Sequence, residues 1–178
     1  MNFERLEKNL TDVIKEAQIK MGYESHETSF NYMLSSLNNL IGEKMNVDEM
    51  KSALKDFPDF IAEKFGEVKI SEKDSVFCFT ISAKGADYVH DNTSNSDFIS
   101  EFINTIRNHG CKFDDVVNVF NKYSDKVHIE KVSNDEFDYL IYFENGIPDD
   151  YYYCISLEGG LHVTYHRFTK EDYKELGF

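Results

Sequence analysis

Apolar residues recur at helical spacing through the first third of the chain. They fall three and four positions apart over residues 3–21, which predicts one long amphipathic helix. A second stripe covers residues 47–65 but contains Pro58, so this segment is either one kinked helix or two helices, the second beginning at Pro58. A short helix over residues 36–41 is also predicted, and the rest of residues 23–46 shows no clear period.

A period of two begins at Val68, as is typical of a half-buried strand. Val68 and Ile70 alternate with polar residues, and Phe77 and Phe79 do the same a few positions later. A four-residue loop over residues 72–75 would place Val68 opposite Phe79 and Ile70 opposite Phe77, with all four side chains on one face. The pattern therefore predicts a small antiparallel hairpin.

Helical spacing returns after a polar segment. Residues 82–95 are predicted to be a loop, and two further helices are predicted over residues 98–106 and 113–123. The first of these is expected to be capped by Ser96, with Asp97 in its first turn.

The final third returns to strands. Alternating and apolar runs predict strands over residues 126–132, 137–144, 151–157 and 161–168. Thr169, three residues before Asp172, is expected to open a short terminal helix. Because helices and antiparallel strands are grouped in blocks, we predict a single α+β domain over residues 1–178, with a C-terminal antiparallel sheet of about four strands.

The register of the last predicted hairpin follows from matching its faces. A two-residue turn at Gly159–Gly160 would set Leu157 opposite His162 and mix apolar with polar residues. A three-residue loop over residues 158–160 would instead set Leu157 opposite Leu161 and make one face wholly apolar. This register also pairs Ile155 with Val163 and Tyr153 with Tyr165.

The other face of that hairpin gathers the candidate site. It would hold a phenol, a thiol, a hydroxyl and two imidazoles: Tyr152, Cys154, Thr164, His162 and His166. A cysteine nucleophile needs an imidazole within hydrogen-bond reach, and a zinc site needs several such ligands together. The two histidines lie about 13 Å apart along a strand, so they cannot both bind one ion. We therefore expect Cys154 to be an ordinary structural thiol, and we predict no metal and no cofactor.

Composition limits the partners that the chain can bind. It carries 19 Lys and Arg residues against 33 Asp and Glu residues, a formal net charge of −14. Residues 113–178 hold 14 of these acids and only 6 of the bases. Nucleic acids and anionic membranes require clustered basic residues, so neither is predicted as a partner, whereas a protein with a basic surface is.

The cysteines and the N-terminus indicate the compartment. Cys78, Cys111 and Cys154 form an odd and scattered set, which is not a disulfide framework. The first ten residues contain no apolar signal-peptide core, and no apolar run approaches the roughly 20 residues that span a bilayer. We expect a cytoplasmic protein.

The sequence contains no specific catalytic, nucleotide-binding or metal-binding motif. His90-Asp91 resembles one pair of metal-phosphohydrolase ligands but falls in a predicted loop. Asp114-Asp115 is explained by a helix N-terminus, and Asp149-Asp150 by a turn.

Two hypotheses on function remain open. The first is a non-enzymatic protein-binding or regulatory module that uses the acidic, tyrosine-rich C-terminal sheet. The second is a small enzyme or metal protein with its site at Cys154, His162 and His166.

Three stretches together resemble a known family. They are NLTDVIKEAQIKMGY at residues 9–23, LSSLNNLIG at residues 34–42 and YHRFTKEDYKELGF at residues 165–178. The chain resembles a family of small bacterial proteins that is classed only as a domain of unknown function. This resemblance implies a bacterial, cytoplasmic setting and brings no catalytic residues.

Overall fold

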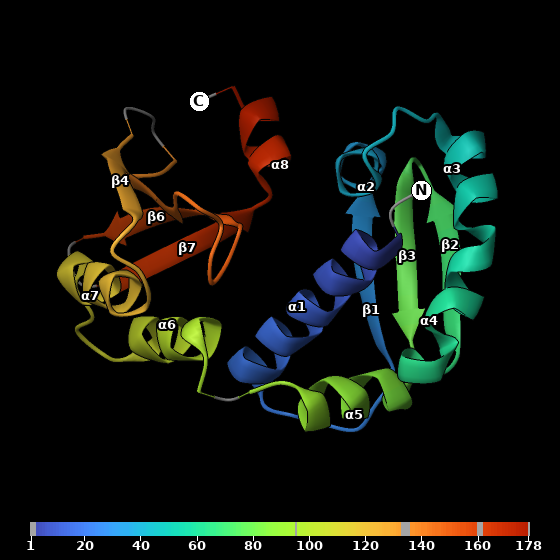
Figure 1. The fold of residues 1–178 in the computed structure, drawn as a ribbon, viewed down its shortest axis with the longest axis horizontal. Helices are drawn as coiled ribbons and strands as arrows, with labels where there is room; N and C mark the ends of the chain where they lie inside the picture. Colours follow the sequence, from blue (N-terminus) through green and yellow to red (C-terminus); the bar gives the residue numbers. More distant parts are fainter. Residues whose placement is uncertain (1–2, 95, 133–135, 160–161, 178) are drawn as a thin grey trace. The chain divides into compact units, whose positions relative to one another are not determined.

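The computed structural model describes residues 3–94, 96–132, 136–159 and 162–177. It has a mixed α+β fold with two antiparallel sheets, and the second is the four-stranded C-terminal sheet that the sequence predicts. The chain divides into two compact units, Met1–Ser94 and Asn95–Phe178 (Figure 1). The single domain over residues 1–178 stays a prediction.

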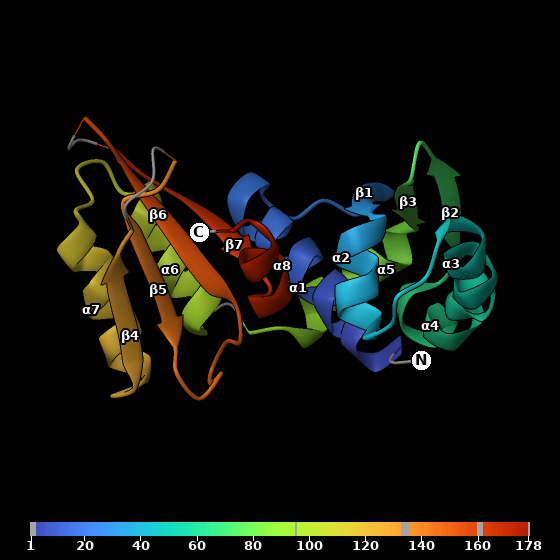
Figure 2. The ribbon, with the colours of Figure 1, turned by 90° about the horizontal axis from the view of Figure 1, so that it is seen from above.

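The N-terminal unit packs helices against one face of a three-stranded sheet with the order β1-β3-β2. Its elements are α1 (Phe3–Met21), β1 (Thr28–Met33), α2 (Leu34–Ile41), α3 (Val47–Ala53), the 3-10 helix η1 (Leu54–Asp56), α4 (Phe57–Phe65), β2 (Val68–Lys73), β3 (Val76–Ile81) and α5 (Ala83–Asn92). Figure 2 shows α1, α3 and α4 on the same side of these strands.

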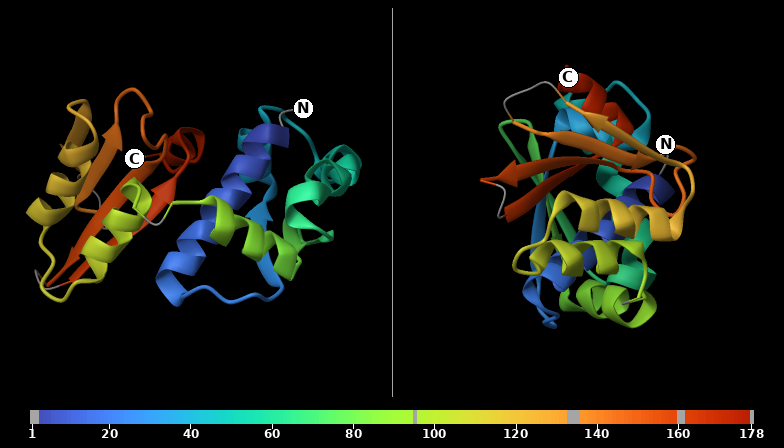
Figure 3. Two further views of the ribbon diagram at one scale, coloured as in Figure 1. Left: turned by 60° about the horizontal axis from the view of Figure 1, so that its bottom comes forward. Right: turned by 90° about the vertical axis from the view of Figure 1, so that its left-hand side faces the viewer.

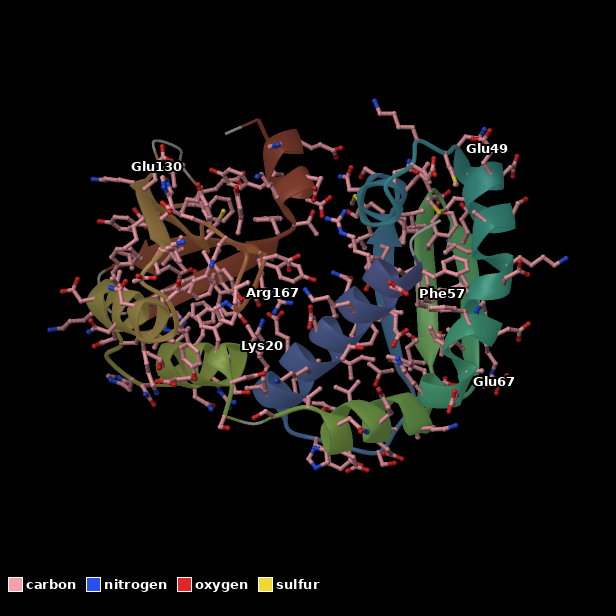
Figure 4. The ribbon with its side chains drawn as sticks, viewed as in Figure 1. Lys20, Glu49, Phe57, Glu67, Glu130 and Arg167 are labelled. Atoms are coloured by element: carbon pink, nitrogen blue, oxygen red, sulfur yellow. The ribbon has the colours of Figure 1, made fainter. Side chains whose placement is uncertain are left out.

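Aromatic rings fill the space between helices and sheet in this unit. Phe57, Phe77 and Phe79 are completely buried, and the rings of Phe57 and Phe79 meet edge to face at 6.0 Å. Phe57, labelled in Figure 4, opens α4 next to Pro58, so the two-helix reading of residues 47–65 is the correct one. The chain passes between α3 and α4 through η1.

Two elements of this unit differ from the predictions. Strand β1 lies in residues 23–35, where no clear period was found, and pairs with β3 along its whole length. Helix α5 occupies most of residues 82–95, which were predicted to be a loop. The helix buries only a narrow face that contains Gly85 and Ala86, so its apolar signal is weak. A methyl group on Gly85 would lie 2.4 Å from Ile81, which shows how closely α5 approaches β3.

The β2–β3 hairpin has the predicted face but a different register. Val68 pairs with Ile81 and Ile70 with Phe79, each two positions from the predicted partner. The loop is a two-residue turn, Asp74-Ser75, with positive φ angles of 53° and 64°, instead of four residues. A shift of two residues leaves every side chain on the same face, so face matching could not detect it.

The C-terminal unit is a four-stranded sheet with the order β4-β5-β6-β7. Its elements are α6 (Phe98–Arg107), α7 (Phe113–Tyr123), β4 (Val127–Lys131), β5 (Tyr139–Phe143), β6 (Tyr152–Glu158), β7 (His162–Phe168) and α8 (Lys170–Glu175). Helices α6 and α7 cover one face, and α8 lies on the other side (Figures 1 and 3). Asp97, not Ser96, caps α6, because its side chain accepts a hydrogen bond from the Ser100 amide.

Rings from the sheet and from both helices make the core of this unit. Phe98, Phe102 and Phe120 from the helices surround the ring of Tyr153, which is completely buried. Phe143 from β5 packs edge to face on Phe98 at 4.8 Å. Burial of a ring of this size stabilises the fold by roughly 1.5–3 kcal/mol.

The β6–β7 hairpin repeats the outcome of the first hairpin. Leu157 pairs with Val163 and Ile155 with Tyr165, so the predicted pairs Leu157–Leu161, Ile155–Val163 and Tyr153–Tyr165 are wrong by two positions. The apolar face is nevertheless the one predicted. The strands end at Glu158 and His162, so the loop begins one residue later than predicted, at Gly159, whose φ angle is +60°. Gly160 and Leu161 lie outside the described residues.

Candidate binding surface on the C-terminal sheet

The residues of the predicted site share the face of the C-terminal sheet that lies away from α6 and α7. The observed register places Cys154 directly opposite His166 and Thr164 opposite Ser156. His162 lies opposite Glu158 at the exposed end of the hairpin, and Tyr152 lies opposite Phe168. The structure therefore brings Cys154 and His166 together and leaves His162 apart from them.

Cys154 is buried and lies in an apolar environment. Its exposed fraction is 0%, and it forms a small cluster with the buried side chains of Phe137 and Leu140. Burial raises the pKa of the Cys154 thiol to about 12, so the thiolate is rare at neutral pH. A thiol in this state is a poor nucleophile and a poor metal ligand.

The two histidines of this face, His162 and His166, are both exposed. His162 lies at the end of the hairpin, whereas His166 packs against aromatic rings. The ring of His166 meets Phe137 edge to face at 5.6 Å and stacks near Phe168 at 6.1 Å. Among the residues that the structure describes, no group of three or more His, Cys, Asp or Glu side chains could hold a metal ion.

A row of aromatic rings crosses this face next to Cys154. His128 of β4 stacks on Tyr142 of β5 at 4.7 Å, and Tyr142 stacks on Tyr152 of β6 at 4.2 Å with 13° between the rings. Tyr173 of α8 follows, 5.3 Å from Tyr152. We call these four residues, His128, Tyr142, Tyr152 and Tyr173, the tyrosine row.

The fold places the members of the tyrosine row by simple rules. His128 and Tyr142 are directly paired between β4 and β5, where side chains stand about 5 Å apart. Tyr173 reaches the sheet because Thr169 caps α8, accepting a hydrogen bond from the Asp172 amide at 3.1 Å. Each stacked pair contributes about 0.5–1.5 kcal/mol beyond its burial, so the row is held in place by its own contacts.

Carboxylates lie close to the tyrosine row. Burial is the main cause that raises the pKa of Tyr142, and the neighbouring Tyr152 hydroxyl and the Glu144 carboxylate raise it further. Burial and nearby negative charges, Glu130 among them, raise the pKa of Tyr173. Glu130, labelled in Figure 4, also lies 3.4 Å from the His128 ring nitrogen. The phenols of Tyr142 and Tyr173 therefore stay neutral and can donate hydrogen bonds beside acidic groups.

The tyrosine row has the chemistry of a recognition surface. All four side chains are half-buried, so each presents part of its ring to solvent. Aromatic rings flanked by carboxylates attract Lys and Arg side chains through cation–π and ionic interactions. Lys170 is the one cation among the causes of the Tyr142 pKa shift, and it lowers that pKa.

Of the tyrosine row, only Tyr152 belongs to the site predicted from the sequence. Tyr142 and Tyr173 are not part of that prediction, although the strand YLIYF contains two tyrosines and α8 contains one. The signal that could have found them is the pairing of Tyr142 with His128, which depends on register.

The other candidate pairs have structural roles. Asp149 accepts a hydrogen bond from the Tyr151 amide at 2.9 Å, as expected for a turn, and burial raises its pKa. Arg167, labelled in Figure 4, lies over the Tyr151 ring at 4.0 Å. Asp115 accepts from the Lys112 amide at the start of α7.

The His90-Asp91 pair lies near the end of α5, which corrects the predicted loop. The ring of His90 stacks on Tyr23 at 3.8 Å. Tyr23 in turn donates to Asp87 at 2.8 Å. His90 is therefore engaged in packing between α5 and the segment after α1.

Comparison with known proteins gives one finding. The family described as "Domain of unknown function, E. rectale Gene description (DUF3877)" matches residues 3–177, which confirms the resemblance found in the sequence. No curated protein and no solved structure gave a match. No helix of the described residues is long and apolar enough to cross a membrane.

Proposed function

The chain belongs to the DUF3877 family, named from the bacterium E. rectale, and we propose that it is a non-enzymatic protein-binding module. Its C-terminal sheet binds a basic segment of a partner protein through the tyrosine row. The observation that carries this proposal is the stack of His128, Tyr142 and Tyr152 across three strands, with carboxylates at its side.

Preorganisation supports this function. The rings pack on one another and on α8, so they lose little conformational freedom when a partner binds. Tyrosine is enriched in interface cores because it offers a large contact area and a hydroxyl donor together.

The charge of the C-terminal unit supports a basic partner. Residues 95–178 hold 16 acidic and 8 basic side chains, a net charge of −8. An acidic field of this kind accelerates encounters with a cationic partner and weakens as salt screens it.

The proposal includes a cytoplasmic location. Cys78, Cys111 and Cys154 are all free thiols, which suits a reducing compartment. The competing hypothesis, an enzyme or metal protein at Cys154, His162 and His166, requires an accessible thiolate. The burial of Cys154 and its pKa of about 12 argue against that requirement.

A peptide selection tests the proposal. The immobilised full chain is offered a display library of random peptides, and an enriched peptide is then titrated by calorimetry. We expect enrichment of Lys and Arg, and weaker binding as salt rises. Tyr152→Ala should reduce affinity by about thirtyfold or more, which corresponds to the roughly 2 kcal/mol of an interface hot spot. Tyr23→Ala, which also removes a stacked tyrosine but in the N-terminal unit, is the matched control and should have no effect.

Selection of neutral or acidic peptides would contradict the proposal. Equal affinity of the Tyr152→Ala variant and the unaltered chain would also contradict it.

A further inference from the structure

The N-terminal unit contains a groove that the proposed function does not use. It has a volume of about 420 Å³ and lies where η1 and the adjoining ends of α3 and α4 pass along β2. Its apolar lining includes Leu54, Ile70 and Phe77, and its charged lining is Lys51, Lys55 and Glu72. We call this cavity the β2 groove. Its size falls within the range of ligand pockets.

The strand that borders the groove is an edge strand. In the described part of the sheet, β2 pairs only with β3. The Ser82 amide donates to the Glu67 carbonyl at 3.1 Å, so the main-chain groups of Glu67 point toward β3. Hydrogen-bonded pairs alternate along an antiparallel ladder, so Ile70 and Glu72 turn their N–H and C=O groups away from β3. These outward groups form no hydrogen bond with another element of the described residues.

The open edge and the apolar wall face the same space. Leu54 and Phe77 are buried beneath the groove, and Ile70 is half-buried at its side. The main-chain N–H and C=O groups of Ile70 point outward from the sheet edge. Its side chain points toward the helices, because its partner Phe79 lies in the core. An extended chain could therefore pair with β2 and place alternate side chains against these apolar residues.

The charges at the groove favour an extended chain that carries a carboxylate. Lys51 lies 3.4 Å from Glu72 and is paired with it. Lys55 is exposed and forms no ion pair with another residue in the described part of the chain. The ammonium group of Lys55 is therefore available to pair with a carboxylate of a bound chain. This contrasts with the N-terminal unit as a whole, where residues 1–94 hold 17 acidic and 11 basic side chains.

We propose that the β2 groove binds an extended peptide segment of a partner protein, which adds to β2 as a further strand. The segment carries an aliphatic residue that packs on Leu54, Ile70 and Phe77. It carries a carboxylate two positions away that pairs with Lys55. The spacing of two follows from the strand period, because residues i and i+2 share a face. This mode of recognition obtains affinity from the main chain and specificity from alternate side chains.

This site is distinct from the tyrosine row in place and in charge preference. The groove would select acidic segments, whereas the C-terminal sheet would select basic ones. The two sites can be tested separately, and either can fail without the other.

The first test uses synthetic peptides and the full chain. The probe is an end-blocked hexapeptide of threonines with one leucine and, two positions later, one glutamate. Its binding is followed by nuclear magnetic resonance, and we expect the amide signals of Ile70 and Glu72 to shift. In a strand paired with β2, every second peptide amide points toward β2 and the others point away. N-methylation of the amides that point toward β2 should weaken binding at least tenfold, and N-methylation of the other set should weaken it less than twofold.

The second test uses matched lysine variants. Lys55→Gln should weaken binding of the glutamate peptide about 1.5- to 5-fold, the range of an exposed ion pair. The same variant should not change binding of a glutamine version of the peptide. Lys69 lies on the same strand but shares a face with Thr80, away from the core, so Lys69→Gln is the control and should have no effect. Tyr152→Ala should also leave this titration unchanged.

Several results would overturn the inference. One is equal loss of affinity for N-methylation of either set of amides, and another is equal weakening by Lys55→Gln and Lys69→Gln. A third is a chain that forms dimers through β2, seen by light scattering and abolished by Ile70→Lys, while no peptide binds. That outcome would assign the open edge to a second copy of this chain.

Discussion

The reactivity of Cys154 separates the two hypotheses on function most sharply. The register places its side chain directly opposite His166, which is the arrangement that an activated thiol would need. The same thiol is completely buried, and burial raises its pKa to about 12 from the ordinary 9.0. We predict that burial dominates and that Cys154 reacts far more slowly than an ordinary thiol.

The size of the effect follows from the pKa. At pH 8, a pKa of about 12 leaves about one thiolate in 10,000, whereas the ordinary value of 9.0 leaves about one in ten. Alkylation of Cys154 by iodoacetamide should therefore be about a thousandfold slower than that of an ordinary thiol. The folded-state pKa is raised, so the stability that the neutral thiol contributes is complete below pH 9. That stability should be lost as the pH rises toward 12.

Mass spectrometry of the alkylated chain provides the assay, with half-buried Cys78 as the internal reference. The reaction is followed from pH 6 to pH 10 in the absence of denaturant. An apparent pKa of Cys154 below 8.5 that rises in the His166→Ala variant would refute this reasoning and favour the enzyme hypothesis.

Three further predictions concern packing and partners. A double-mutant cycle with Tyr142→Ala and Tyr152→Ala, measured by urea unfolding, should give a coupling of about 0.5–1.5 kcal/mol, because the two rings stack. Additive effects would contradict the stack. Gly85→Ala should lower the free energy of unfolding by about 1–3 kcal/mol despite the better helix propensity of Ala, because the new methyl group would meet Ile81 at 2.4 Å. A stabilised variant would show that α5 can move away. Duplex DNA and RNA should cause no salt-sensitive shift in a mobility assay, since 33 acidic residues outnumber 19 basic ones. Binding at physiological salt would refute this prediction.

The two hairpins show what alternation along a sequence can determine. In both, the apolar face is the predicted one and the register differs by two residues. The period of a strand is two, so a shift of two residues leaves every side chain on the same face and keeps the same residues buried. The choice between such registers depends on the turn, here Asp74-Ser75 with two positive φ angles and Gly159 with one. Positive φ at a serine is uncommon, so the residue types of this turn do not predict it.

Elements with weak periodicity were missed for a different reason. Helix α5 presents Gly85 and Ala86 to the core, and these small residues bury well without an apolar stripe. On the core side of strand β1, only Phe30 and Tyr32 are apolar, because the third residue of that face is Thr28, and two apolar residues are too few to identify a strand. In both cases tertiary packing decides the local structure, and a single sequence does not display that packing.

The candidate site was predictable in part. The face shared by Tyr152, Cys154, Thr164, His162 and His166 follows from alternation alone and is correct. The direct pairing of Cys154 with His166 depends on register and was not predicted. Predicting the tyrosine row requires knowledge of the contacts between three strands and α8, because Tyr142 and Tyr173 are 31 residues apart along the chain.

We propose above that the tyrosine row binds a basic segment of a partner protein. The most direct measurement maps a library-selected peptide onto the amide signals of the full chain by nuclear magnetic resonance. We expect the selection to yield a Lys- or Arg-containing peptide whose largest shifts fall on β4, β5 and α8, at His128, Tyr142 and Tyr173. Shifts confined to other surfaces, or unchanged in the Tyr142→Ala variant, would contradict it.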